Sequence, residues 1–208
     1  MPLLQSTVKA SDEKGFSIVT YSGASTNSRI GHGLSGAPDM IFIKRRNASS
    51  SWIVYHTELG GGATLFLDSA DSYVVNGYLD NKNPTAIEFF VSDSDETNNA
   101  GSEYVAYCWR SITGLSSFGS YTGNGGTNSI TTGFKPAWLM VKRTDGANSW
   151  YIFDAARGET NYLLADSAAK ESGGVAITFD SNGFTWSSGA VGINASGGNY
   201  IYAAFSAE

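Results

Sequence analysis

The 208-residue chain contains two similar halves, and this internal repeat constrains its fold more than any other feature. Matching segments follow one another in the same order in both halves, about 100 residues apart, whereas solenoid repeats have periods of roughly 20–50 residues. The clearest pairs are Pro38–Arg45 with Pro136–Arg143, Ser51–Tyr55 with Ser149–Phe153, Asp68–Ser69 with Asp166–Ser167, and Tyr104–Tyr107 with Tyr200–Ala203. The sequence therefore predicts two copies of one structural unit rather than a solenoid.

Short apolar segments, separated by turns rich in Gly, Asn and Ser, predict that both halves are built from β-strands. No apolar pattern with a helical period persists for three turns, so long helices are not expected. Expected strands cover residues 15–21, 40–43, 52–55, 64–67, 87–91 and 104–109 in the first half, and 118–122, 137–143, 149–154, 161–165, 175–180, 183–187 and 199–205 in the second. The predicted fold is all-β: an antiparallel β-sandwich of jelly-roll or lectin-like type, built from two internal repeats.

Four segments describe the expected domain organisation. Residues 1–14 are polar and are interpreted as an N-terminal arm outside the core. Residues 15–110 form the first β repeat, residues 111–117 a connector, and residues 118–208 the second β repeat. Because the connector is short, we expect the two repeats to form one compact unit.

Composition excludes several classes of protein. Apolar residues make up 41% of the chain and aromatic residues 13%, which excludes a disordered chain. No apolar run reaches the roughly 18 residues of a membrane-spanning helix, and Met1–Gln5 does not open a secretory signal. The net charge of −6 disfavours nucleic acid as a partner. Cys108 is the only cysteine, so an intrachain disulfide is excluded.

The residues do not predict a catalytic site. A Ser-His-Asp arrangement needs a placed histidine, and the two present, His32 and His56, are explained as a loop residue and a strand-end residue. No Gly-x-Ser-x-Gly segment supports a hydrolase. A glycosidase needs two close carboxylates, but nothing in the sequence pairs Glu58 with Glu88. We therefore expect a protein that is not an enzyme and that carries no cofactor.

The acidic segment after residue 92 is the candidate for a metal site. Asp93, Asp95 and Glu96 offer the hard oxygen ligands that calcium prefers. The segment lacks the glycine and the twelfth-position glutamate of an EF-hand loop, and a plain solvated loop is the favoured explanation.

Aromatic residues are the candidates for ligand contacts, because a ring face can meet the apolar face of a sugar. Trp52 and Trp150 occupy matching positions in the two halves, which favours a shared role in the core. Trp138 and Trp186 have no aromatic counterpart, so they are candidates for a binding surface, with core packing as the alternative. His32 joins them as a loop residue between glycines that could hydrogen-bond a ligand, with plain exposure to solvent as its alternative.

Several segments in one order carry a resemblance to a known family. They are Lys14–Gly23, Gly31–Leu34, Phe118–Gly125, Gly133–Trp138, Val141–Asp145 and Asn194–Phe205. Together they resemble a family of tailed bacteriophage proteins, the domain of unknown function 7483 of marine and cyanobacterial phages. The resemblance extends from about residue 14 to residue 206.

The resemblance implies a lectin-like β-sandwich carried on virion structural proteins such as tail fibres, tailspikes or appendages. It implies no catalytic residues. We expect a virion protein that contacts other virion proteins, attaches to host-surface glycan and forms a homotrimer, without nucleic acid or membrane insertion. The alternatives are a decoration, spacer or assembly protein that binds no host ligand, and a polysaccharide depolymerase.

Overall fold

A computed structural model describes residues 1–207, which form β-strands and one four-residue helix, α1 (Asp95–Asn98). The strands of the first half are β1 (Leu3–Leu4), β2 (Ser6–Ser11), β3 (Phe16–Ser22), β4 (Ser28–Gly31), β5 (Met40–Arg45), β6 (Ile53–His56), β7 (Ala63–Phe66), β8 (Val74–Val75), β9 (Glu88–Val91) and β10 (Glu103–Trp109). Those of the second half are β11 (Ser116–Thr122), β12 (Asn128–Thr131), β13 (Pro136–Arg143), β14 (Trp150–Asp154), β15 (Tyr162–Leu164), β16 (Ile177–Asp180), β17 (Gly183–Trp186) and β18 (Asn199–Ser206). The prediction of an all-β protein with mostly antiparallel sheets is confirmed.

The chain divides into two compact units. Unit 1 contains residues 1–67 and 73–111, and unit 2 contains residues 68–72 together with residues 112 onward. The five residues 68–72, which we call the strap, thus follow β7 in the chain but belong to unit 2.

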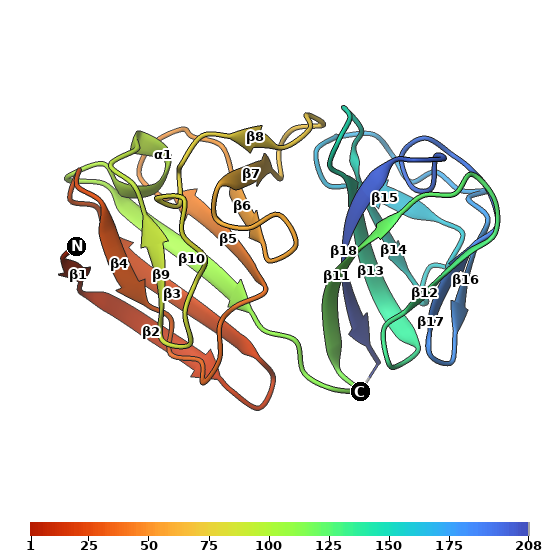
Figure 1. Ribbon diagram of the computed structural model, residues 1–208, viewed down its shortest axis with the longest axis horizontal. Coiled ribbons are helices and arrows are strands. Elements are labelled where there is room, and N and C mark those ends of the chain that lie inside the picture. The colour runs from red at the N-terminus through yellow and green to blue at the C-terminus, as the bar shows by residue number, and fades with distance from the viewer. Residues whose placement is uncertain (208) are drawn as a thin grey trace. The chain divides into compact units, whose positions relative to one another are not determined.

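Unit 1 has two sheets that share one core (Figure 1). The larger sheet has the strand order β2-β3-β10-β5-β6-β7-β8, and the smaller sheet has the order β1-β4-β9. Val19, Ile43 and Tyr104 reach the core from the larger sheet, and Ile30 and Phe89 reach it from the smaller one. Burial of these apolar side chains from both sides stabilises the pair of sheets.

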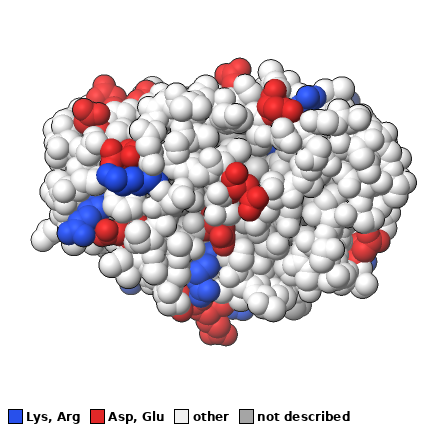
Figure 2. Space-filling view, in the orientation of Figure 1, with Lys and Arg blue, Asp and Glu red and all other residues white. Residues whose placement is uncertain are grey.

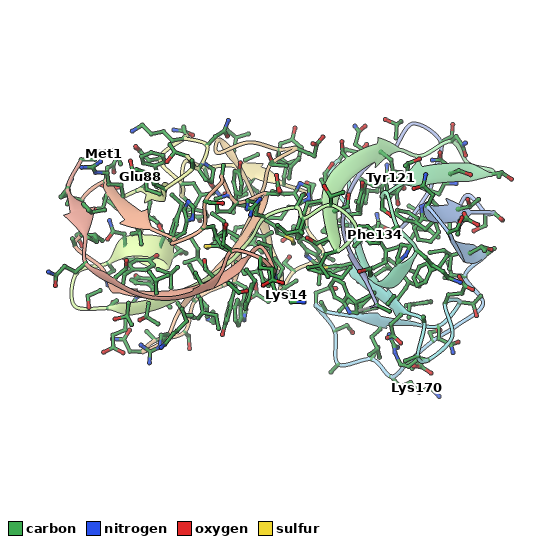
Figure 3. The ribbon with its side chains drawn as sticks, turned by 90° about the horizontal axis from the view of Figure 1, so that it is seen from below. Met1, Lys14, Glu88, Tyr121, Phe134 and Lys170 are labelled. Carbon is green, nitrogen blue, oxygen red and sulfur yellow. The ribbon has the colours of Figure 1, made fainter. Side chains whose placement is uncertain are left out.

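Unit 2 also has two sheets, with strand orders β11-β18-β13-β14-β15 and β12-β17-β16. Leu139, Phe153 and Tyr200 come from the larger sheet, and Phe184 and Trp186 come from the smaller one. Figure 3 shows side chains filling the space between the strands of each unit. In unit 1 the last strand, β10, lies between β3 and β5. In unit 2 the last strand, β18, lies between β11 and β13.

The same buried asparagine network occurs in both units. Asn98 and Asn194 have no exposed surface. The Asn98 side chain accepts a hydrogen bond from the Ala24 nitrogen at 2.8 Å and donates to the oxygens of Thr26 at 2.6 Å and Ser92 at 2.9 Å. The bonds to Ala24 and Thr26 join segments that lie more than 70 residues apart in the chain.

In unit 2, Asn194 accepts from the Asn124 nitrogen at 3.1 Å and donates to the oxygens of Gly126 at 2.7 Å and Ser188 at 3.0 Å. The glycines beside the two networks are also matched. A Cβ atom at Gly23 would lie 2.2 Å from the Asn99 oxygen, and one at Gly123 would lie 2.2 Å from the Ala195 oxygen. Both turns therefore require a residue without a side chain.

Two expectations about chain segments are wrong. Residues 1–14 were expected to lie outside the core, yet they form β1 and β2, and Leu4 and Val8 pack against the core of unit 1. The backbone of β3 offers a free edge, so even the polar sequence of β2 can pair with it. The second segment is the acidic one, which forms α1 instead of a loop because Ser94 caps it and accepts a bond from the Glu96 nitrogen at 3.3 Å.

A buried lysine holds the strap within unit 2. Lys142 has no exposed surface, and its Nζ donates to the Ala70 oxygen at 3.2 Å and to the Arg143 oxygen at 2.6 Å. The Asn148 nitrogen donates to the same Ala70 oxygen at 2.7 Å. Burial lowers the pKa of Lys142 to about 8, although the carboxylates of Asp166 and Asp71 act in the opposite direction. Burying this ammonium group therefore costs free energy at neutral pH.

Candidate functional site

The structure places His32 inside unit 1 and not at its surface. The side chain has no exposed area; its Nε2 lies 3.1 Å from the Thr85 oxygen and its Nδ1 accepts from the Leu34 nitrogen at 3.2 Å. Because Nδ1 accepts, Nε2 carries the proton and donates, so the ring is neutral. Both expectations for His32, ligand contact and exposure to solvent, are wrong for this reason: the ring nitrogens are used to hold the loop.

We expect the stability of unit 1 to fall as the pH is lowered, because of His32. Burial lowers the pKa of His32 below its ordinary value of 6.5, so the unfolded chain binds a proton at a pH at which the folded unit does not. The stabilisation is complete above pH 6.5 and is lost as the pH falls toward the folded pKa. Urea unfolding between pH 8 and pH 5 measures this slope, and the His32→Gln variant should show a flatter one. Equal slopes in the two proteins would contradict the assignment.

The two unmatched tryptophans lie in different surroundings. Trp186 has no exposed surface and packs edge-on against Phe153 with ring centroids 5.6 Å apart, so it fills the core of unit 2 and is not a surface residue. Trp138 is half-buried and contacts Phe205, with centroids 5.5 Å apart. The matched pair does not share a role in the core: Trp150 is buried but lies outside the core cluster of unit 2, and Trp52 is only half-buried. The structure does not bring Trp138, Trp186 and His32 together.

The charged candidates do not form a site either. Among residues 1–207, no three His, Cys, Asp or Glu side chains are arranged to hold a metal ion, so Asp93, Asp95 and Glu96 do not form a calcium site. Glu88 is largely covered and pairs with Arg29, whose Nη1 lies 3.3 Å from its Oε2.

In the described chain no helix is long and apolar enough to span a membrane.

A cluster of aromatic side chains covers the outer face of the larger sheet of unit 1, which is the face turned away from the core. We call it the aromatic face; its members, all half-buried, are Phe16, Phe42, Trp52, Tyr107 and Trp109. Side chains alternate between the two faces of a strand, so the buried partners in β3 and β10 point into the core while these rings point outward.

Register places these rings next to one another. Phe16 pairs with Trp109 across β3 and β10, and their ring centroids are 5.2 Å apart. Tyr107 pairs with Phe42 across β10 and β5. Phe42 meets Trp109 edge-on at 4.9 Å, and Trp52 stacks on Tyr107 at 6.3 Å. Contacts of this geometry are each worth about 0.5–1.5 kcal/mol beyond the burial of area, so the rings stabilise one another as a single cluster.

The corresponding face of unit 2 carries fewer rings. Tyr107 pairs with Phe42 in unit 1, whereas Ala203 pairs with Met140 at the matching place in unit 2. A smaller cluster remains there, in which Phe205 contacts both Trp138 and Phe118. Phe118 is buried. The larger aromatic surface therefore belongs to unit 1.

Sequence reasoning missed the aromatic face although the sequence carries a signal for it. The positions of β10 that point away from the core hold Val105, Tyr107 and Trp109, and those of β3 hold Phe16, Ile18 and Thr20, so apolar side chains occupy most of them. A half-buried strand of a single sheet should have polar residues on its outer face. Apolar and aromatic residues at these outward positions were the indication of an aromatic cluster outside the core.

Charge does not concentrate on one side in the view of Figure 2. Lys, Arg, Asp and Glu side chains form small mixed groups there, separated by wide areas without charge. A phosphate backbone is bound by clustered Lys and Arg, so this face offers no surface of that kind. Apolar stacking and hydrogen bonding are the interactions that the aromatic face can supply.

Comparison with known proteins finds one matching protein family. A family model described as "Domain of unknown function (DUF7483)" matches residues 3–208. No curated protein and no solved structure matches the chain significantly.

Proposed function

The chain belongs to the DUF7483 family, and from this we propose that it is a bacteriophage virion module, a domain of a tail fibre or appendage that attaches to host-surface glycan. The aromatic face is the observation that carries the proposal. Half-buried rings that stabilise one another provide flat apolar surfaces, and such surfaces stack on the C–H face of a sugar ring at little conformational cost.

We further propose that the module consists of two lectin-like, jelly-roll β-sandwiches that arose as copies of one unit. The matched asparagine networks of Asn98 and Asn194 and the matched strand orders support this. The copies differ in their outer faces, because Tyr107 and Ala203 occupy corresponding register positions. A duplicated scaffold with one specialised face fits an adhesion role for unit 1 and a supporting role for unit 2.

Binding to purified polysaccharides tests the adhesion role. We expect the protein to bind at least one capsular polysaccharide or lipopolysaccharide from a panel of marine and cyanobacterial strains, measured by biolayer interferometry. The Trp109→Ala variant should lose tenfold or more in affinity, since removal of a ring at the centre of a contact costs about 1.4 kcal/mol or more.

Trp138→Ala is the matched control, because Trp138 is also half-buried on an outer sheet face but lies in unit 2. It should bind as the wild type does. Thermal unfolding of each variant separates loss of binding from loss of folding. A panel without any bound polysaccharide, or equal losses in both variants, would count against the proposal.

A second candidate rests on the same face: docking to another virion protein as a decoration or spacer module. Ile18 lies beside Tyr107 in the register of β3 and β10 and is 37% exposed, and exposed apolar patches also mark protein interfaces.

We propose in addition that the adhesion module acts as a homotrimer, since several weak sites on one particle raise avidity. Light scattering after gel filtration measures the mass, and a monomer would favour the decoration module.

A further inference from the structure

A cavity of about 630 Å³ opens in unit 1 among residues of β1, β2, β3, β4 and the start of β10. This volume is within the range of about 300–1,000 Å³ that is typical of sites for small ligands. Polar side chains in its wall include Thr7, Thr20 and Ser22, together with Arg46 and Glu103.

Strand register connects this cavity to the aromatic face. Thr20 lies in β3 on the same side as Phe16 and Ile18, because residues two apart in a strand share a face. Thr20 pairs with Val105 in β10, and Val105 is two residues from Tyr107. One continuous outer face therefore has aromatic rings at one end and hydroxyl groups at the other.

The polar end also holds an ion pair that faces solvent. Arg46 Nη1 lies 3.3 Å from Glu103 Oε2, with 49% and 57% of the two side chains exposed. The Arg46 nitrogen donates to the Glu103 oxygen of the backbone at 2.7 Å, and this bond fixes the position of Arg46 beside β10. An exposed pair of this kind adds little to stability, so a ligand that engages its groups would disturb the fold little.

We infer that the cavity is the subsite that selects a neutral sugar residue of the glycan, and this inference rests on the proposed adhesion function. Two neighbouring hydroxyls of a hexose can donate to the Glu103 carboxylate and accept from the Arg46 guanidinium at the same time. Thr7 and Thr20, which pair across β2 and β3, supply further hydroxyls. A uronic acid would bring its carboxylate against Glu103, so the cavity disfavours acidic sugars.

The charge of Glu103 provides the sharpest test, carried out with the full chain. Methyl glucoside, methyl galactoside and glucuronate are titrated at millimolar concentration while the methyl resonances of Thr7 and Thr20 are followed by NMR. We expect a neutral glycoside to shift these resonances and glucuronate not to shift them. In Glu103→Gln the affinity for the neutral sugar should fall about fivefold, and that for glucuronate should rise because Arg46 loses its partner.

Two further variants keep the outcomes distinct. Glu13→Gln changes an exposed carboxylate of unit 1 outside the cavity and should behave as the wild type. Thr20→Val keeps the shape and strand propensity of Thr20 but removes its hydroxyl, and it should weaken binding of the neutral glycoside about threefold.

If the polysaccharide panel gives a ligand that Trp109→Ala no longer binds, but Glu103→Gln and Thr20→Val bind both sugars as the wild type does, the subsite inference is wrong and the adhesion function stands. If no polysaccharide and no glycoside binds, both are wrong. If glucuronate binds the wild type more tightly than the neutral glycosides, the cavity selects the opposite class of sugar and the inference is overturned.

Discussion

Replacing Asn194 by alanine is expected to lower the free energy of unfolding of unit 2 by about 4 kcal/mol. The side chain is fully buried and bonds to the Asn124 nitrogen and to the oxygens of Gly126 and Ser188. Alanine leaves these three backbone groups without their partner, and each unsatisfied buried group costs roughly 1–3 kcal/mol. Urea unfolding followed by near-ultraviolet circular dichroism gives the value.

Asn98→Ala should have an effect of similar size on unit 1, because its hydrogen bonds to Ala24, Thr26 and Ser92 are the counterparts of those in unit 2. Asn182→Ala is the control: Asn182 is exposed in the turn between β16 and β17, and its replacement should change stability by less than about 0.5 kcal/mol. A loss below about 1 kcal/mol in both buried variants would mean that the networks do not hold the units together.

The second large effect is a dependence of stability on pH that Lys142 produces. Its pKa is about 8 in the folded protein and 10.5 ordinarily, so between these values the unfolded chain binds more protons. The free energy of unfolding therefore rises with pH across this window, and the stabilisation is lost as the pH falls through 8. A shift of this size corresponds to about 3 kcal/mol, which solvent screening reduces to about 2 kcal/mol.

Lys142→Met should remove this rise. Methionine places an apolar chain of similar length in the same buried position, and the Ala70 oxygen still accepts from the Asn148 nitrogen. The variant should accordingly be at least as stable as the wild type at pH 7. At pH 10 the difference between the two proteins should have moved by about 2 kcal/mol in favour of the wild type.

Titration of tyrosines also changes stability at high pH, since desolvation raises the pKa of Tyr21, which is buried, and of Tyr121, which is partly buried. Their contribution is the same in wild type and variant, so only the difference between the two proteins is interpreted. Lys135→Met, at an exposed lysine of the same unit, serves as the control and should run parallel to the wild type. A wild-type profile parallel to that of Lys142→Met would show that the buried amine does not titrate in this window.

The proposed function connects these stability effects to binding. If unit 1 carries the glycan site, Asn98→Ala should reduce adhesion by unfolding the platform, whereas Asn194→Ala should leave the aromatic face of unit 1 intact. Binding and unfolding measured on the same two variants would thus separate the contributions of the units.

The sequence by itself determined the all-β class of the protein and the positions of many of its strands. Alternating and continuous apolar runs such as Phe16–Tyr21 and Met40–Ile43 predicted strands where β3 and β5 lie, because a side-chain period of two is a local property of the chain.

The tertiary structure alone decided which side of each strand became the core. The sequence of β17 does not reveal whether Trp186 points toward the larger sheet or toward solvent, and its burial follows from the sheet that lies opposite. The same holds for the rings of the aromatic face, which point outward because the other side of β3 and β10 already meets the smaller sheet.

Contacts between residues far apart in the chain were also beyond prediction. His32 is buried because its Nε2–H donates a hydrogen bond to the Thr85 oxygen, 53 residues away in the chain. The strap joins unit 2 because the Lys142 ammonium, 72 residues from Ala70, needs an acceptor. Segments 1–14 became strands only because β3 and β4 offered their edges. The local sequence pattern decides whether a segment can form a strand. The unsatisfied polar groups and the apolar faces of distant segments decide which sheet or unit that segment packs against.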